Sequence, residues 1–223
     1  MKRSEINTLM QEAVTFFEAH SFHLPPFAFW RPSDWASKGP EADEIRQCHL
    51  GWDLTDFGCG DFRRIGLLLF TTRNGNVHDP SNPKTYAEKI MIVDEGQVTP
   101  WHFHGGKIED IINRGGGNLV IDLCNSDRDR NLQDTPVSVS IDGVRQTVGP
   151  RGRAILHPGE SIALPQCLAH QFYGEAGKGK VMVGEVSSVN DDQADNFFIE
   201  PVGRFPQIEE DGEPLYLLCN EYP

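Results

Sequence analysis

Residues 99–110 (TPWHFHGGKIED) place two imidazoles, an amine and a carboxylate within a dozen positions. On an extended strand alternate side chains face the same side, so His102 and His104 project together while the aromatic residues beside them project the other way. A His-x-His pair taken alone is more often a partly exposed pair of histidines than a metal site. Its interpretation therefore depends on the neighbouring residues.

The double glycine that follows sets the geometry expected of this stretch. If residues 105–106 form a two-residue hairpin turn, Glu109 lies opposite His102, because directly paired strand positions share one face. Lys107 then lies opposite His104 on the same patch. Imidazole nitrogens and a carboxylate oxygen suit Mn²⁺, Fe²⁺, Zn²⁺, Co²⁺ or Ni²⁺. The stretch thus indicates a divalent-metal site with a lysine beside it.

A further histidine, His170, ends the apolar segment at residues 159–170 (GESIALPQCLAH) and strengthens this interpretation. The remaining histidines lie outside these motifs, and solitary histidines are usually satisfied surface or core residues. We therefore expect structural roles for the following residues: His20, His23, His49, His78 and His157.

Composition limits the classes of protein that the chain can belong to. Its 223 residues, 38% hydrophobic and 24% charged, are enough for a substantial core and typical of a soluble globular protein. A net charge of −13 argues against nucleic acid and anionic membranes as partners. No apolar run resembles a membrane span or secretory signal, and five scattered cysteines suggest no disulfide framework. We expect a cytoplasmic protein that binds a small molecule or another copy of itself.

The N-terminal part predicts a helix followed by an irregular arm. Apolar residues recur at three- and four-residue steps over residues 6–17, with Ser4 as a candidate N-cap. Residues 24–44 are rich in proline and aromatic side chains, which disfavours a regular ladder. Trp30 and Trp35 are interpreted as packing within this arm, which could also cover a pocket.

From about residue 62 the chain reads as short strands separated by turns. The clearest pair is VSVSIDGVRQTV, at residues 137–148, where the strands alternate around Asp142-Gly143, a pair that type I′ turns favour. At least eight such segments occur with no helical segment between them, a pattern typical of a β-sandwich or barrel.

Two of the motifs match a known pattern. The spacing Gly-x5-His-x-His-x4-Glu-x6-Gly over residues 96–116 reproduces the first motif of the cupin superfamily, and Gly-x5-Pro-x4-His over residues 159–170 resembles the second. The second motif departs at Cys167, where glycine is usual, and at Gly174, where asparagine is usual. The resemblance implies a mainly β fold, a double-stranded β-helix (jelly-roll) barrel. It also implies four ligands to one divalent metal: His102, His104, Glu109 and His170.

This resemblance implies a single cupin domain over residues 1–223. Residues 1–60 would form the helix and arm, residues 61–190 the barrel, and residues 191–223 a C-terminal tail packed near the barrel. An octahedral ion with four protein ligands would keep two positions open for water or a chelating substrate, which is a catalytic arrangement rather than a structural one.

Over nearly its full length the chain resembles the D-lyxose isomerase family of cupin sugar isomerases. The resemblance rests on the helix and aromatic arm, on PWHFHGGKIEDIINRGGG at residues 100–117, and on the tail from residue 184. It implies a homodimeric, Mn²⁺-dependent aldose–ketose isomerase acting on D-lyxose and D-xylulose, and further on D-mannose and D-fructose. Zn²⁺, Co²⁺, Fe²⁺ and Ni²⁺ remain alternatives as the metal.

Three residues are candidates for the catalytic chemistry. Moving a proton between C1 and C2 through an enediol requires a base, and Glu185 is out of place on an otherwise apolar strand. Lys107 could donate to the sugar oxygens, and Arg204 could hold hydroxyl groups. The alternatives are a water-facing glutamate for Glu185 and, for Arg204, a surface pair with an acidic residue at 209–211.

Two other functions are compatible with the same motifs. An Fe²⁺ dioxygenase would use three histidines and one glutamate but would consume oxygen, and a non-catalytic sugar-binding cupin would bind without turnover. Asp191 and Asp192 are interpreted as a solvated turn that could reach the mouth of the pocket.

Overall fold

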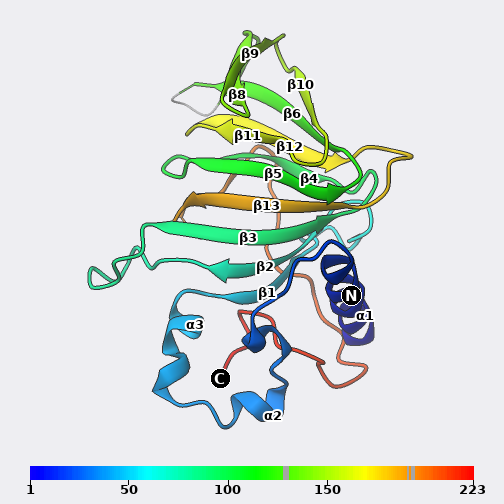
Figure 1. Ribbon diagram of the computed structural model, residues 1–223, viewed down its shortest axis with the longest axis vertical. Coiled ribbons are helices and arrows are strands. Elements are labelled where there is room, and N and C mark those ends of the chain that lie inside the picture. The colour runs from blue at the N-terminus through cyan, green and yellow to red at the C-terminus, as the bar shows by residue number, and fades with distance from the viewer. Residues whose placement is uncertain (128–130, 190, 192–193) are drawn as a thin grey trace.

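The computed structural model describes residues 1–127, 131–189, 191 and 194–223, which form two antiparallel β-sheets with a helix and an arm on one side (Figure 1). The larger sheet has the strand order β1-β2-β3-β13-β5-β11-β8-β9, and the smaller has the order β10-β6-β12-β4-β14, with β7 paired to β6. The strands are β1 (Gly51–Thr55), β2 (Leu67–Arg73), β3 (Tyr86–Val93), β4 (Thr99–Phe103), β5 (Glu109–Gly116), β6 (Leu119–Ser126), β7 (Leu132–Gln133), β8 (Val137–Ile141), β9 (Val144–Val148), β10 (Arg153–Leu156), β11 (Ser161–Leu164), β12 (Leu168–Gly174), β13 (Val181–Ser188) and β14 (Phe197–Phe198).

The inner faces of the two sheets pack on one another. Alternate residues such as Leu69, Met91 and Val183 of the larger sheet share an apolar cluster with Leu123 and Phe172 of the smaller sheet. Because strand side chains alternate between faces, every second residue of these strands is available to line the interior. The expected mainly β barrel of the cupin type is confirmed.

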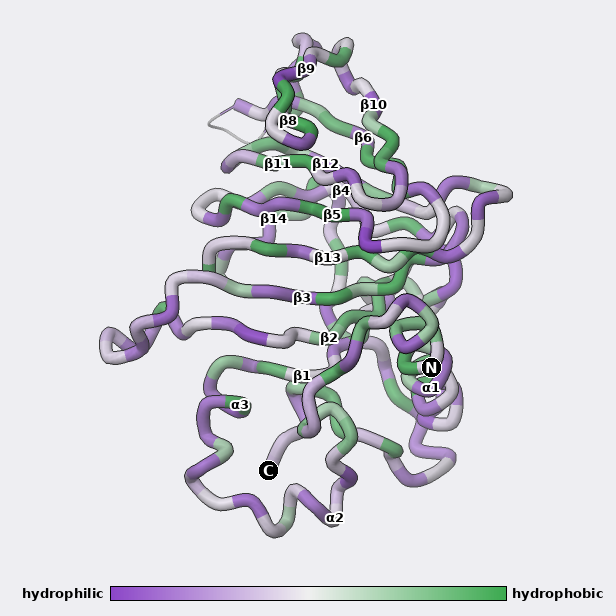
Figure 2. The backbone as a smooth tube through the Cα atoms, viewed as in Figure 1, coloured by the Kyte–Doolittle hydropathy of each residue, from purple (hydrophilic) through white to green (hydrophobic). Residues whose placement is uncertain are grey.

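The outer face of the larger sheet is covered by helix α1 (Arg3–Ala19), which lies beside β1, β2 and β3 in Figure 1. Ile6, Met10 and Phe17 of α1 pack with Phe70 and Met182 of the sheet in a second apolar cluster. Figure 2 shows hydrophobic residues along the central strands and more hydrophilic residues around the loop that carries the short helices. Those helices are α2 (Pro32–Trp35) and α3 (Asp43–Gln47), with 3-10 turns at Pro26–Phe29 and Pro40–Ala42.

The start of α1 differs from the expectation. Ser4 lies inside the helix, and the N-cap is Lys2, whose side chain caps nothing. The backbone N–H and the hydroxyl of Ser4 both donate to the carboxylate of Asp211 in the C-terminal tail. The helix therefore receives its capping acceptor from the other end of the chain, a contact that local sequence does not encode.

The predicted hairpin at residues 137–148 is confirmed: β8 and β9 pair antiparallel, and Asp142 and Gly143 both have positive φ, 48° and 80°. Strand β1, at residues 51–55, lies within the first 60 residues that were expected to form the helix and arm, and it pairs with β2 inside the larger sheet. Among the described residues no helix is long and apolar enough to cross a membrane.

The hairpin expected within residues 99–110 is also wrong. β4 pairs with β12 and β14 in the smaller sheet, whereas β5 pairs with β13 and β11 in the larger sheet. Residues 104–108 therefore cross from one sheet to the other. His102 faces His170 of β12 in the strand register, and Glu109 approaches from the opposite sheet.

Candidate metal centre

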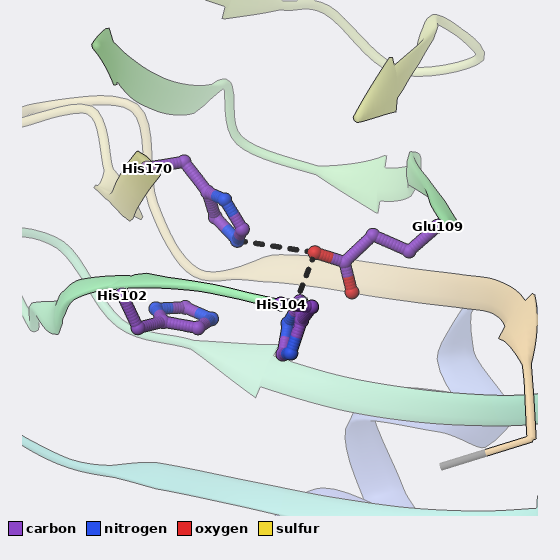
Figure 3. Close-up of side chains that lie close together, drawn as sticks. All are labelled: His102, His104, Glu109 and His170. Atoms are coloured by element: carbon purple, nitrogen blue, oxygen red, sulfur yellow. Dashed lines mark ion pairs between the residues drawn. The ribbon is translucent and has the colours of Figure 1, made fainter. Parts of the chain in front are cut away.

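Three histidines and a glutamate meet between the two sheets (Figure 3). Their ligand atoms all lie within 4.8 Å of one another, and all four side chains are buried. His102 comes from β4 and His104 from the crossing segment after it, while Glu109 begins β5 and His170 lies on β12. The four residues that the sequence motifs select are thus brought together by strands of both sheets.

Backbone carbonyl groups orient the three imidazoles. The Nδ1 atom of each ring lies 2.8 or 2.9 Å from a main-chain oxygen, which is that of Pro100 for His102, Asp195 for His104 and Leu168 for His170. A carbonyl can only accept, so each Nδ1 carries a proton, and the neutral form of each ring has its lone pair on Nε2. This is the tautomer that metal-binding histidines adopt when an outer partner holds the other nitrogen.

Three inward-facing atoms of this cluster have no hydrogen-bond partners among the described residues. Nε2 of His104 and Nε2 of His170 lie 3.4 and 3.1 Å from Oε1 of Glu109, the contacts dashed in Figure 3. All three atoms are buried and unsatisfied. With both Nδ1 protons donated elsewhere, these contacts bring lone pairs together, an arrangement that a bound cation would relieve. The donor set therefore fits a divalent ion.

The protonation states agree with ligand chemistry. Burial and the two neighbouring imidazoles hold the pKa of His102 well below its ordinary value, so its ring is neutral. Burial raises the pKa of Glu109, but the ammonium group of Lys107 and the neighbouring imidazoles of His104 and His170 together outweigh this effect and keep that pKa well below its usual range. The cluster thus offers the neutral imidazole of His102 and an ionised carboxylate, the forms that bind metal ions.

A chain of alternating charges extends from the cluster along the barrel interior. Nζ of Lys107 lies 2.6 Å from Oε2 of Glu109 and 2.9 Å from Oε1 of Glu185. Lys89, on β3 opposite Glu185 in the strand register, approaches the same oxygen of Glu185 at 3.5 Å. Glu185 is 5% exposed, so its expected alternative as a residue facing water at the rim is wrong.

Both members of the Lys107–Glu185 pair are ionised. Burial raises the pKa of Glu185, but Lys107 and Lys89 together outweigh burial and leave that pKa below the ordinary value. Burial lowers the pKa of Lys107, but the carboxylates of Glu109 and Glu185 raise it above its usual range. A carboxylate able to accept a proton therefore lies beside an ammonium able to donate a hydrogen bond.

Two cavities that share lining residues lie beside these groups. The inner cavity, of about 80 Å³, is lined by the four-residue cluster, Lys107 and Glu185. The outer cavity has a volume of about 770 Å³. Among the described residues, four line both cavities and mark their junction: Lys89, Asn196, Phe198 and Arg204.

Arg204 lies at this junction and not among the acidic residues of the tail. Its guanidinium group pairs through both nitrogens with the carboxylate of Asp53 on β1, and the Nη1–Oδ1 distance is 3.3 Å. The expected surface pair with an acidic residue at 209–211 is wrong. Glu210 pairs instead with Arg3 of α1. Arg204 thus faces the pocket from a fixed position.

The other residues singled out by the sequence divide between packing and the outer cavity. Trp35 stacks on Tyr222 with ring centroids 4.1 Å apart, Trp30 packs edge-on against Trp35, and neither is among the described residues that line the two cavities. His49, His78 and Asp191 line the outer cavity instead, while Asp192 lies outside the described residues. His49 and His78 therefore form part of the wall of this cavity, in addition to the structural role expected of them.

Lys89 and Asp53 are site residues that sequence reasoning missed. Each interrupts an apolar strand, in AEKIMIV and GWDLT respectively, and each is buried. Charged residues are rarely buried without a partner. A charge inside a strongly apolar strand was therefore an available signal, and it is the same signal that selected Glu185.

Solved structures agree on the fold. The L-ribose isomerase of Cellulomonas parahominis, solved with L-ribose, superposes with a TM-score of 0.62 at 17% identity, covering 94% of this chain and 98% of that one. The L-ribose isomerase of Acinetobacter sp. DL28, also in complex with L-ribose, gives a TM-score of 0.60 at 15% identity over 93% and 98%. The chain is therefore a cupin-type barrel with a three-histidine, one-glutamate cluster between its sheets.

Sequence relatives define the family more narrowly. Residues 1–222 match the model of the D-lyxose isomerase family. The chain is 51% identical to a D-lyxose/D-mannose isomerase of Serratia proteamaculans and 50% identical to one of Escherichia coli O157:H7, in each case over 100% of this chain and 98% of the relative. The chain belongs to the D-lyxose isomerase family, which confirms the expected aldose–ketose isomerase.

Proposed function

We propose that this enzyme interconverts D-lyxose with D-xylulose, and D-mannose with D-fructose, at a divalent metal ion held by His102, His104, Glu109 and His170. The observation that carries the proposal is the set of unpartnered donor atoms beside the Lys107–Glu185 pair. The names of the two relatives at about half identity support the choice of sugars. Mn²⁺ is the expected ion.

The bound ion would supply a Lewis acid that polarises the sugar carbonyl and its neighbouring hydroxyl group. Glu185 is proposed as the base. It accepts the proton from C2 of the aldose while the C–H electron pair forms the C1–C2 double bond and the carbonyl π pair moves to the oxygen on C1, which gives an enediolate. Glu185 then returns a proton to C1, and the proton of the C2 hydroxyl group passes to the oxygen on C1. These transfers balance and yield the ketose.

Lys107 and Lys89 serve this transfer in different ways. Lys107, 2.9 Å from the oxygen of Glu185, can donate a hydrogen bond to the sugar oxygen that gains negative charge. Lys89, 3.5 Å from the same oxygen, keeps the carboxylate ionised and holds it on the inner face of β13. Arg204, fixed by Asp53 at the junction, can hold the hydroxyl groups of the remaining carbons.

The volumes of the two cavities support acceptance of both pentose and hexose. One water requires about 10–15 Å³ of such volume, so the inner cavity of about 80 Å³ holds only part of a sugar. The reacting end would occupy the inner cavity, and the distal carbons would extend past Arg204 into the outer cavity of about 770 Å³. The extra hydroxymethyl group of D-mannose then meets open space instead of a wall.

Reconstitution with a defined ion tests the proposal. The purified protein is stripped with chelator, Mn²⁺ is restored, and ketose formation from D-lyxose and D-mannose is followed without oxygen. We expect ketose from both sugars only when metal is present. Absence of ketose with either sugar would contradict the proposal, and oxygen uptake with Fe²⁺ would favour the dioxygenase. The proposed homodimer, which rests on the family resemblance, is checked by light scattering of the eluted protein.

A further inference from the structure

The segment that crosses between the sheets, residues 104–108, carries two of the groups assigned to the site. It leaves β4 after Phe103 and joins β5 at Glu109. At its end the carbonyl of Ile108 accepts from the N–H of Ser188 on β13, whereas the amides of residues 105–107 bond to no strand among the described residues. His104 begins this segment and Lys107 lies three residues later. Both residues are buried, so their main-chain polar groups require partners from elsewhere in the chain.

One aspartate of the C-terminal tail satisfies three consecutive amides of this segment. Oδ1 of Asp195 accepts hydrogen bonds from the backbone N–H groups of Gly105 and Gly106, each at 2.8 Å. Oδ2 accepts from the N–H of Lys107, also at 2.8 Å. Consecutive N–H groups converging on an anion form a nest, a strong backbone arrangement for a carboxylate.

The same aspartate also contacts a proposed ligand directly. Its main-chain carbonyl accepts the Nδ1–H of His104 at 2.8 Å, which selects the tautomer with a free Nε2. On the opposite side, the N–H of Cys167 donates to the carbonyl of His104 at 2.7 Å, and the side-chain amide of Gln166 donates to the carbonyl of Gly106. The crossing segment is thus held from the tail and from the loop before β12.

We propose that Asp195 is a positioning residue of the metal centre, whose carboxylate fixes residues 105–107 and whose carbonyl sets the orientation of His104. This role rests on the proposed function, because it presumes that His104 binds the ion. The side chain and the carbonyl belong to one residue, so loosening the carboxylate contacts also releases the hydrogen bond that orients the imidazole. Lys107, whose N–H is in the same nest, loses its position relative to Glu185 as well.

A variant series tests this role through metal affinity, which is measured independently of turnover. Asp195→Ala removes all three carboxylate contacts, and Asp195→Asn keeps one acceptor oxygen but places an amide donor against backbone donors. Asp211→Ala is the matched control, because Asp211 also accepts a backbone N–H from another part of the chain but lies at α1. The dissociation constants for Co²⁺ and Mn²⁺ are measured by chelator competition, together with the absorption spectrum of the Co²⁺ form.

We expect the dissociation constant to rise about 10–100-fold in Asp195→Ala, as for other residues that orient metal ligands, and less in Asp195→Asn. The Co²⁺ spectrum should change in both variants, whereas Asp211→Ala should keep the affinity and spectrum of the natural protein. Affinity and spectrum unchanged in Asp195→Ala would overturn the positioning role and leave the proposed isomerase intact. Affinity that depends on Asp195 in a protein that forms no ketose would support the role while overturning the proposed function.

Discussion

His102 lies directly opposite His170 in the antiparallel pairing of β4 with β12, and their ring centroids are 4.3 Å apart. The two sequence motifs are therefore joined by strand register and do not depend on a flexible loop. Glu109 reaches the same point from the other sheet, so the cluster spans the barrel interior. A proposed metal ion at this point would link the two sheets as well as bind substrate.

Substitution of Glu185 separates turnover from metal binding. Glu185→Gln keeps the shape of the side chain but cannot accept a proton, so we expect the turnover number to fall about 10²–10⁴-fold for both sugars. Bound metal should stay near one ion per chain, because Glu185 is not among the cluster atoms. The matched control is Glu88→Gln on the neighbouring strand β3, where Glu88 pairs with Arg73. Full turnover in Glu185→Gln would remove the assignment of the base.

Asp53 holds Arg204 beside the cavities, so substitution of Arg204 should weaken sugar binding and turnover while bound metal is kept. Losing one charged hydrogen bond of about 1.5–3 kcal/mol should lower kcat/KM about 10–100-fold in Arg204→Met for D-lyxose and D-mannose alike. Arg153→Met is the control, because Arg153 also pairs with an aspartate, Asp122, but is not among the described residues lining the two cavities. An unchanged kcat/KM in Arg204→Met would show that the arginine serves packing alone.

Replacing Cys167, which departs from the second motif, with glycine should stabilise the protein. Cys167 has a φ of 62°, in the left-handed region that glycine adopts freely. For other residues this conformation is about 1–2 kcal/mol less favourable. Glycine loses about 0.5–1 kcal/mol of chain entropy, so Cys167→Gly should raise Tm by about 2 °C. Cys59→Gly, at an exposed cysteine without positive φ, should lower Tm instead. A lower Tm in both variants would contradict the strain assigned to residue 167.

The ion pair between the buried Arg3 and Glu210 should make the stability of the protein depend on pH in acid. Its hydrogen bonds to Glu210 lower the pKa of that carboxyl group below the ordinary value. A depressed folded-state pKa contributes stability above the unfolded value of about 4.3, and this contribution disappears as the pH falls through the folded-state pKa. The Tm difference between the natural protein and Arg3→Met should therefore narrow from pH 7 to pH 3. A difference independent of pH would show that the carboxylate charge contributes nothing.

The sequence predicted the four-residue cluster but not how it is assembled. Motif spacing selected the four cluster residues, because cupin strands place them at fixed positions. The hairpin expected at residues 105–106 was wrong because a double glycine permits a crossing between sheets as readily as a turn within one. What distinguishes the two is Asp195, which supplies the acceptors that a paired strand would otherwise provide. Such a partner is invisible in the local sequence.

The proposed catalytic residues could be predicted where a charged side chain interrupts an apolar strand. Glu185 was found in this way, and Lys89 and Asp53 could have been. The partner of Arg204 was missed because an arginine in an irregular tail has no periodicity to place it. The cap of α1 was missed for the same reason, since Asp211 joins the helix only through the folded tail.

Metal content measured together with turnover tests the central claim most directly. The natural protein, His102→Ala, Glu109→Gln and the control Glu160→Gln are dialysed against Mn²⁺, and bound metal per chain is determined beside ketose formation and circular dichroism. We expect about one ion in the natural protein and in Glu160→Gln, and loss of both metal and turnover in the two cluster variants while the β-sheet spectrum is kept. Full isomerase activity in folded His102→Ala or Glu109→Gln without bound metal would contradict the account.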